Sequence, residues 1–139
     1  MVDVGFAVGV SHCLYGPYET PSKSLFETNT RHTLVIIEGN ILKVFWSREG
    51  DAPERLLVSQ VELSRPHWNN WQATEGAELL RPELSWKGVD MPVMSSLRGE
   101  MNSPFNELRD PYILSDVDGK EYFFYAGGGE QAFGIALLK

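Results

Sequence analysis

Short apolar segments of strand length, separated by turn residues, form the clearest pattern in the chain. Residues 33–38 are β-branched and aliphatic, Gly39-Asn40 is a two-residue turn sequence, and residues 41–46 are again apolar. β-Branched residues favour strands, and Gly and Asn adopt the positive φ angles of tight hairpin turns. This pattern predicts a β-hairpin. After a polar loop, residues 55–63 predict a third strand and residues 68–74 a fourth, outer strand.

The last third of the chain repeats this pattern. Residues 111–114 and 121–126 predict two strands, joined by a tight turn at Asp118-Gly119. The three glycines at 127–129 then lead into an apolar segment at 133–138. Residues 6–10 have the same character as this last segment, which predicts another strand near the N-terminus.

The two patterns are separated by residues 75–107, which have no clean period. This segment contains three prolines, but also Leu79, Leu80 and Trp86. Because it is too apolar for a disordered linker, we expect an ordered, irregular excursion. No part of the chain requires a helix longer than a turn or two.

The 139 residues are about one domain's worth of chain, since domains have roughly 100–200 residues. We therefore predict a single all-β domain over residues 1–139. Two antiparallel units of three to four strands are typical of β-propeller blades. The predicted layout is a partial blade at 6–26, a blade at 31–74, the excursion at 75–107 and a blade at 108–139.

The number of predicted blades indicates self-association. About two and a half blades cannot close a ring, because propellers usually have about 4–8 blades. Open strand edges expose unpaired N–H and C=O groups that pair readily with another chain. The expected partner is therefore a second copy of this chain, in a homo-oligomer and first of all a homodimer.

Charge and cysteine content narrow the expected partners and compartment. The formal net charge is −7, from 12 Lys and Arg against 19 Asp and Glu, which is the wrong sign for binding nucleic acid. The single cysteine, Cys13, cannot form an internal disulfide, which favours a reducing compartment. The sequence has no secretory signal pattern and no apolar window of the roughly 18 residues that a membrane span needs. A cytoplasmic protein without a membrane partner is expected.

Three stretches carry a resemblance to a known family. They are residues 108–114 with 118–125, residues 16–19 with 25–26, and residues 31–33 with the hairpin that ends at 45–48. Arg109-Asp110-Pro111 is similar to a blade-opening pattern that places a carboxylate at the central channel, and Arg31-His32-Thr33 to a blade that begins with a channel-facing His. Together these stretches resemble the five-bladed β-propeller glycosidases of the arabinanase, β-xylosidase and furanosidase type. The resemblance implies a partial five-bladed β-propeller.

The resemblance also implies site residues. Asp110 would be the catalytic carboxylate, with Arg109 and His32 binding substrate beside it. Glycoside hydrolysis uses two carboxyl groups, roughly 5–5.5 Å apart for retention or 6.5–9.5 Å for inversion, and only Asp110 matches one of the family's three acidic groups. In the alternative interpretation, Asp110 shapes a turn and pairs with Arg109, and His32 is a hydrogen-bonded structural residue.

A charged loop supplies further candidates for substrate binding. Arg48, Glu54 and Arg55 form a charged loop that could present a guanidinium fork to a carboxylate or a sugar, or could be a solvated loop with internal ion pairs. Trp68, Trp71 and Trp86 are candidates for an exposed aromatic platform or a subunit seam. No metal ligands and no cofactor are predicted, and the resemblance leaves a channel ion such as calcium open.

Two functions follow as hypotheses. The first is a carbohydrate-related protein that resembles a β-propeller glycoside hydrolase and acts on or binds a glycoside, as a truncated or inactive relative if it is not an enzyme. The second is a non-catalytic binding or assembly module that keeps only the propeller scaffold.

Overall fold

The structure is a computed structural model that describes residues 11, 13–19, 23–65 and 67–138. The strand predicted at 6–10 lies outside the described residues. The elements are, in chain order, β1 (Thr30–Glu38), β2 (Ile41–Arg48), β3 (Leu56–Glu62), the 3-10 helix η1 (Trp68–Asn70), β4 (Ala77–Leu80), the 3-10 helix η2 (Ser85–Lys87), β5 (Leu108–Ser115), β6 (Glu121–Gly127) and β7 (Ala132–Leu137). Within the described part of the chain there is no α-helix, so the all-β prediction is confirmed.

The first sheet has four strands in the order β1-β2-β3-β4, each antiparallel to its neighbour. The predicted hairpin is confirmed, because Glu38 pairs with Ile41 across the Gly39-Asn40 turn. Gly39 has a φ of 58°, a value that favours glycine, and this explains why the turn falls there.

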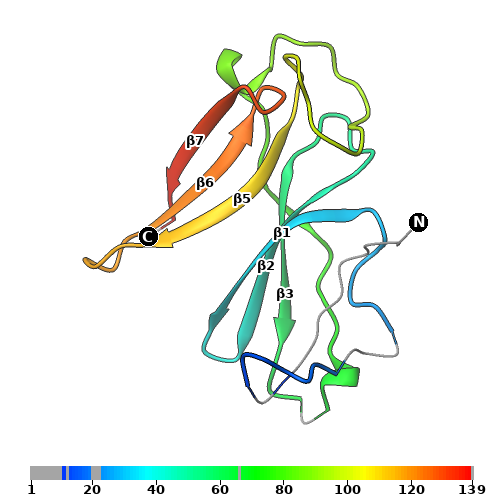
Figure 1. Ribbon diagram of the computed structural model, residues 1–139, viewed down its shortest axis with the longest axis vertical. Coiled ribbons are helices and arrows are strands. Elements are labelled where there is room, and N and C mark those ends of the chain that lie inside the picture. Colours follow the sequence, from blue (N-terminus) through cyan, green and yellow to red (C-terminus); the bar gives the residue numbers. More distant parts are fainter. Residues whose placement is uncertain (1–10, 12, 20–22, 66, 139) are drawn as a thin grey trace.

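The second sheet has three antiparallel strands in the order β5-β6-β7 (Figure 1). Its hairpins also form at the predicted turns. Gly119 turns the chain between β5 and β6 with a φ of 81°, and Gly128 and Gly129 turn it between β6 and β7 with φ values of 67° and 74°.

The prediction of an outer strand at residues 68–74 is wrong. Residues 68–70 form η1, and only Ala73 bridges to Val61. Trp71 packs instead against the apolar cluster on β2 and β3, so its burial comes from side-chain packing rather than from strand pairing. The outer strand is β4, which lies in the segment predicted to be irregular and pairs with the edge of β3.

The two sheets pack against each other through an apolar core. Phe45 and Leu56 of the first sheet contact Leu108, Phe123 and Tyr125 of the second. The rings of Phe45 and Phe123 lie 5.4 Å apart, centre to centre. A second apolar cluster covers the opposite face of the first sheet and consists of Leu42, Val44, Trp46, Leu57 and Val61.

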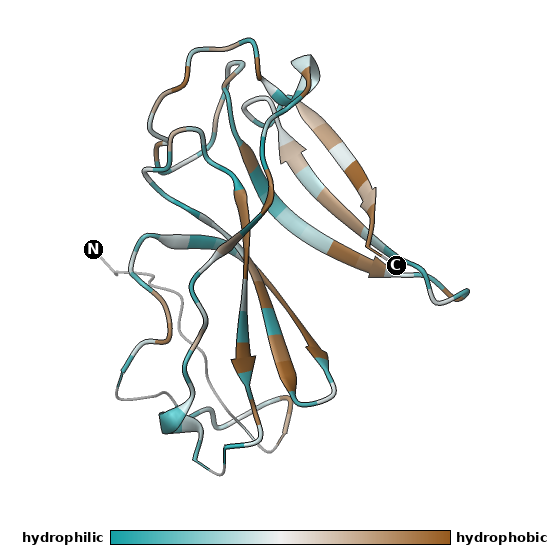
Figure 2. Cartoon of the chain, turned by 180° about the vertical axis from the view of Figure 1, so that it is seen from behind, coloured by the Kyte–Doolittle hydropathy of each residue, from teal (hydrophilic) through white to brown (hydrophobic). Residues whose placement is uncertain are grey.

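The described residues form two packed sheets that do not close into a ring (Figures 1 and 2). β1 and β5, the first strands of the two sheets, lie next to each other at the junction. The described part of the chain contains no helix long and apolar enough to cross a membrane.

Candidate functional site

The first strand of each sheet contains a β-bulge at the same place. In β1, the three-residue step from Arg31 to Leu34 lies opposite the two-residue step from Ser47 to Phe45. In β5, the step from Arg109 to Tyr112 has the same irregularity. One extra residue in a strand bends it and redirects its side chains, and bulges of this kind are common next to functional sites.

Each bulge turns one side chain inward and the next one outward. Arg31 and Arg109 point into the junction, where Arg109 is only 1% exposed. The residues that follow them, His32 and Asp110, have φ values of 51° and 50°. A positive φ is uncommon outside glycine but is tolerated best by Asn, Asp and His, and it accumulates at functional sites. The two bulges therefore place one imidazole and one carboxylate side by side.

Glu54 lies at the centre of the junction and is fully buried. Arg31 binds this carboxylate through two nitrogens: Nε donates to Oε1 at 3.0 Å, and Nη2 donates to Oε2. Arg109 Nε lies 3.3 Å from the same Oε2. Burial alone would raise the pKa of Glu54, but hydrogen bonds from His32, Arg31 and Ser47 outweigh it and lower that pKa to about 2. Glu54 is therefore a buried carboxylate that stays ionised.

Arg109 joins Glu54 to two further glutamates. Its Nη2 lies 2.7 Å from Oε2 of the fully buried Glu107, and its Nη1 donates to Glu130 Oε1 at 3.0 Å. Burial raises the pKa of Glu107 to about 7; Arg109 opposes this shift and the charge of Glu54 adds to it. Glu54 and Glu107 are thus two buried carboxyl groups in contact with the same guanidinium, and their pKa values are shifted in opposite directions.

The long excursion closes over this cluster. Leu97 O accepts hydrogen bonds from Arg31 Nη1 at 2.9 Å and from Arg109 Nη2 at 3.0 Å, and Gly99 O accepts one from Arg109 Nη1 at 2.8 Å. Ser96 N also donates to Asp51 O at 2.9 Å. The segment before β5 therefore packs on the cluster, and its carbonyl groups accept hydrogen bonds from both arginines.

Above the cluster lies an open hollow of about 470 Å³. It is lined by Thr30, Arg31, His32, Arg98, Gly99, Glu100, Asp110 and Glu130. His32 Nε2 lies 3.5 Å from Asp110 Oδ1, and His32 Nδ1 lies 2.9 Å from Ser47 Oγ. Ser47 and Glu54 fix the inner edge of the imidazole, so its outer nitrogen is presented to Asp110 and to the hollow.

The structure brings together some of the predicted site residues and separates others. Asp110 and His32 line one hollow, and Arg109 lies beneath them in contact with glutamates rather than with Asp110. The three candidates from the predicted charged loop lie in different environments. Glu54 is buried in the cluster, whereas Arg48 and Arg55 pair with Asp51 at the surface.

Arg48 and Arg55 therefore form the internal ion pairs that were the alternative to a role in substrate binding. Arg55 also pairs with Glu78 of β4, and Arg48 lies over the ring of Trp46. Neither arginine lines the hollow that contains Asp110 and His32.

Sequence reasoning missed Arg31, Glu107 and Glu130 as parts of the site. One signal was available for Arg31, because Arg31-His32-Thr33 and Arg109-Asp110-Pro111 occupy equivalent places in the two units. Glu107 and Glu130 had no such signal, since each belongs to the site only through its contact with Arg109, which the sequence does not reveal. Among the described residues, no group of three or more His, Cys, Asp and Glu side chains is arranged to hold a metal ion.

Comparison with known proteins gives one viral relative. The chain is 38% identical over 109 residues to an uncharacterized protein of Acanthamoeba polyphaga mimivirus. The match covers 78% of this chain and 30% of the viral protein, so the chain spans less than a third of that relative's length. No family model matches the chain, and no solved structure matches it at a significant level. The functional argument therefore rests on the site itself.

Proposed function

We propose that this chain is a carbohydrate-binding module built from blades of the β-propeller glycosidase type, with the sugar held at the His32–Asp110 hollow. The observation that carries the proposal is the pair of equivalent bulges, which place His32 and Asp110 3.5 Å apart at the mouth of one hollow. An imidazole offers a donor or an acceptor and a carboxylate offers acceptors, and sugar hydroxyl groups need both.

The arrangement favours binding over hydrolysis. Hydrolysis needs a general acid with a raised pKa that reaches the glycosidic oxygen. Glu107 has such a pKa, about 7, but both of its carboxyl oxygens are buried, and Oε2 lies 2.7 Å from Arg109 Nη2. Glu100 and Glu130 share the hollow with Asp110, and Glu130 is already paired with Arg109. The buried glutamates therefore act as a support that fixes the two bulges.

The first prediction concerns Asp110→Asn. We expect this variant to fold as the wild type does, because Asn tolerates the positive φ at this position and the side chain is 51% exposed. Its affinity for the preferred ligand among linear arabino- and xylo-oligosaccharides should fall by about tenfold or more, since a hydrogen bond to a charged acceptor is lost. Isothermal titration calorimetry measures the affinity, and circular dichroism measures the fold.

Asp118→Asn is the matched control for this experiment. Asp118 is also a surface aspartate and pairs with Lys120, and neither residue lines the hollow. Unchanged affinity in Asp110→Asn, or no binding of either sugar series by the wild type, would contradict the proposed role of the hollow.

A second candidate function, an assembly module, is favoured by the outer face of the second sheet. Tyr112 and Leu114 of β5 and Phe133, Ile135 and Leu137 of β7 are 47–84% exposed. Strand pairing places Tyr112 and Ile135 on either side of Phe124. These side chains face away from the first sheet, because the alternate residues pack into the core between the sheets. Figure 2 has apolar segments along β5 and β7 in this sheet.

The occupant of this face that we propose is a second copy of the chain. Five large apolar side chains exposed to this degree present on the order of 500 Å², more than the single scattered residues of an ordinary surface. That is most of the roughly 800 Å² per partner that a specific interface buries. The five side chains carry no charge, so two copies with a net charge of −7 can meet here without burying like charges.

The second prediction tests this face with Ile135→Lys. We expect the wild type to be a dimer at low micromolar concentration and Ile135→Lys to be a monomer, because a buried ammonium group without a partner opposes association. Val117→Lys is the control, since Val117 is fully exposed at the tip of the β5–β6 hairpin and lies outside the face. Light scattering coupled to size exclusion measures the mass. A monomeric wild type, or dissociation of both variants alike, would overturn the assembly function.

A further inference from the structure

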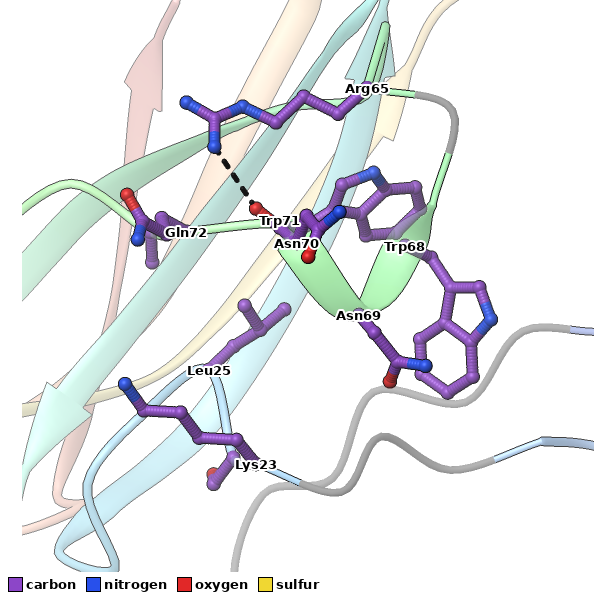
Figure 3. A pocket seen from close by; sticks show the side chains of 10 residues that line it. Lys23, Leu25, Arg65, Trp68, Asn69, Asn70, Trp71 and Gln72 are labelled. Atoms are coloured by element: carbon purple, nitrogen blue, oxygen red, sulfur yellow. Dashed lines mark hydrogen bonds between the residues drawn. The ribbon is translucent and has the colours of Figure 1, made fainter.

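A second hollow, larger than the one at His32 and Asp110, lies on the other side of the first sheet, away from the second sheet. It has a volume of about 670 Å³ and is lined by residues 23–25 and by Arg65 and residues 68–73 (Figure 3). Its inner wall is fixed to the fold, because Trp71 and Ala73 pack on the cluster of β2 and β3. Thr74 N also donates to Gln60 O at 2.9 Å, and Gln60 N donates to Thr74 Oγ1 at 2.9 Å.

The lining combines aromatic, amide and cationic groups. Trp68 and Trp71 supply indole rings, and Asn69, Asn70 and Gln72 supply amides. The two cations are Lys23 and Arg65, and the described residues that line the hollow include no carboxylate. In Figure 3, the charged ends of Arg65 and Lys23 lie toward Gln72, whereas Trp68 lies at the opposite end of the hollow.

The two cations are unusual in this protein. Among the described residues, every lysine and arginine pairs with a carboxylate except Lys23, Arg65 and Lys87. Lys87 is buried and lies over the rings of Trp86 and Tyr125. The two exposed cations without a carboxylate partner therefore lie in the same hollow of a chain whose net charge is −7. Arg65 Nη1 donates to Asn70 O at 3.2 Å, which holds the guanidinium at the rim and leaves its other nitrogens available.

This combination of indole, amide and cationic groups is chemically complementary to an acidic sugar. The C–H faces of a sugar ring pack on an indole, and side-chain amides both donate to and accept from hydroxyl groups. A guanidinium forms charge-assisted, often bidentate hydrogen bonds with a carboxylate or an oxyanion ester. A neutral sugar would leave both cations without a partner, and an anion without a ring would leave the indoles unused.

We propose that this hollow binds an anionic saccharide, with Trp68 packing on the sugar ring and Arg65 and Lys23 binding its carboxylate or sulfate group. This inference shares only the ligand class with the proposed function, because the hollow contains neither His32 nor Asp110. Trp71 forms the wall, since it is partly buried against the core, and Trp68 is the side chain that a ligand contacts.

Three ligands test the proposal and identify the source of the negative charge: trigalacturonate, its fully methyl-esterified form and a sulfated oligosaccharide. We expect the quenching of tryptophan fluorescence, and the shift of the Trp68 indole N–H signal in NMR spectra, to be produced by an anionic ligand and not by the ester. The relative affinities for trigalacturonate and the sulfated oligosaccharide determine whether the anion is a carboxylate or a sulfate. If neither anionic ligand binds, or if the ester binds equally well, the proposal is overturned.

Variants locate the site. Arg65→Gln and Lys23→Gln should each weaken binding by about tenfold, the effect of losing one charge-assisted hydrogen bond, and Trp68→Ala should weaken it at least as much. Lys120→Gln is the control, because it makes the same change in net charge on the β5–β6 hairpin, outside the hollow. Asp110→Asn should leave this binding unchanged. If Asp110→Asn weakens it and Lys23→Gln does not, the ligand binds at the His32–Asp110 hollow, and this proposal fails while the proposed function stands.

Discussion

Replacing Arg109 with methionine is expected to lower the free energy of unfolding by about 3–5 kcal/mol. The guanidinium is 1% exposed and lies between Glu54 and Glu107, which are both fully buried. Methionine fills a similar volume but leaves Arg31 as the one guanidinium in contact with the charge of Glu54. Removal of one partner from a buried ion pair is strongly destabilising because the remaining charge stays desolvated. Urea denaturation at pH 7 measures the effect.

Arg98→Met is the control for this prediction. Arg98 also forms an arginine–glutamate pair, with Glu49 at 2.8 Å, but its side chain is 60% exposed. Exposed pairs contribute about 0–1 kcal/mol, so the control should change stability little. The double variant Arg109→Met/Glu107→Gln should be less destabilised than the sum of its single variants, because removing Glu107 also removes an uncompensated carboxyl. Equal, small losses for Arg109→Met and Arg98→Met would mean that the cluster does not hold the sheets together.

The hairpins were predictable because their signals are local. Gly39-Asn40 and Asp118-Gly119 each lie between apolar segments, and each contains a glycine at positive φ in the structure. The two-residue turn at Gly39-Asn40 also fixes the register of β1 and β2, because Glu38 then pairs with Ile41. The connection between β5 and β6 is longer, since Ser115 pairs with Glu121, and the register of these two strands does not follow from Asp118-Gly119 alone. The predicted strands at 41–46, 55–63 and 121–126 all fall on β2, β3 and β6.

The outer strand was not predictable in this way. Residues 68–74 are aromatic and short, which resembles a strand, but Asn69 and Asn70 form the turn of η1 instead. β4 has a weaker pattern, with two exposed and two partly buried residues, and exists because the edge of β3 is available to it. Pairing with a neighbouring strand is a tertiary effect that a single-sequence pattern does not contain.

The candidate site was predictable only in part, for the same reason. Asp110 and His32 follow arginines at the starts of apolar segments, and this position is visible in the sequence. Their meeting at 3.5 Å depends on two bulges, which have no signature in the residues around them. Glu54 looks like part of a solvated loop, but it is buried because its partners, Arg31 and Arg109, come from distant strands.

The protein is expected to be most stable near pH 4.5. Its free energy of unfolding should fall by up to about 3 kcal/mol toward neutral pH and again toward strongly acidic pH. The size of the loss follows from about 1.36 kcal/mol for each unit of difference between the folded and unfolded pKa values. Between pH 4.5 and 7, Glu107 keeps its proton in the folded protein, where its pKa is about 7, and loses it in the unfolded chain, where it is 4.5. The unfolded chain then binds fewer protons, so stability falls as the pH rises. Below pH 4.5, Glu54 stays ionised when folded, with a pKa of about 2, and takes up a proton when unfolded. Stability therefore also falls as the pH drops.

The variant Glu107→Gln tests the loss of stability toward neutral pH independently of the loss toward acidic pH. A neutral amide cannot titrate, so we expect the loss between pH 4.5 and 7 to disappear while the acid side remains. The variant should therefore be at least as stable as the wild type at pH 7. Glu100→Gln is the control, because Glu100 is an exposed carboxylate of the nearby hollow and its removal should leave the whole profile unchanged. Thermal and urea unfolding from pH 2 to pH 8 measure the profile. A wild type whose stability rises steadily from pH 4.5 to 7 would mean that Glu107 ionises normally and that Arg109 neutralises both buried glutamates.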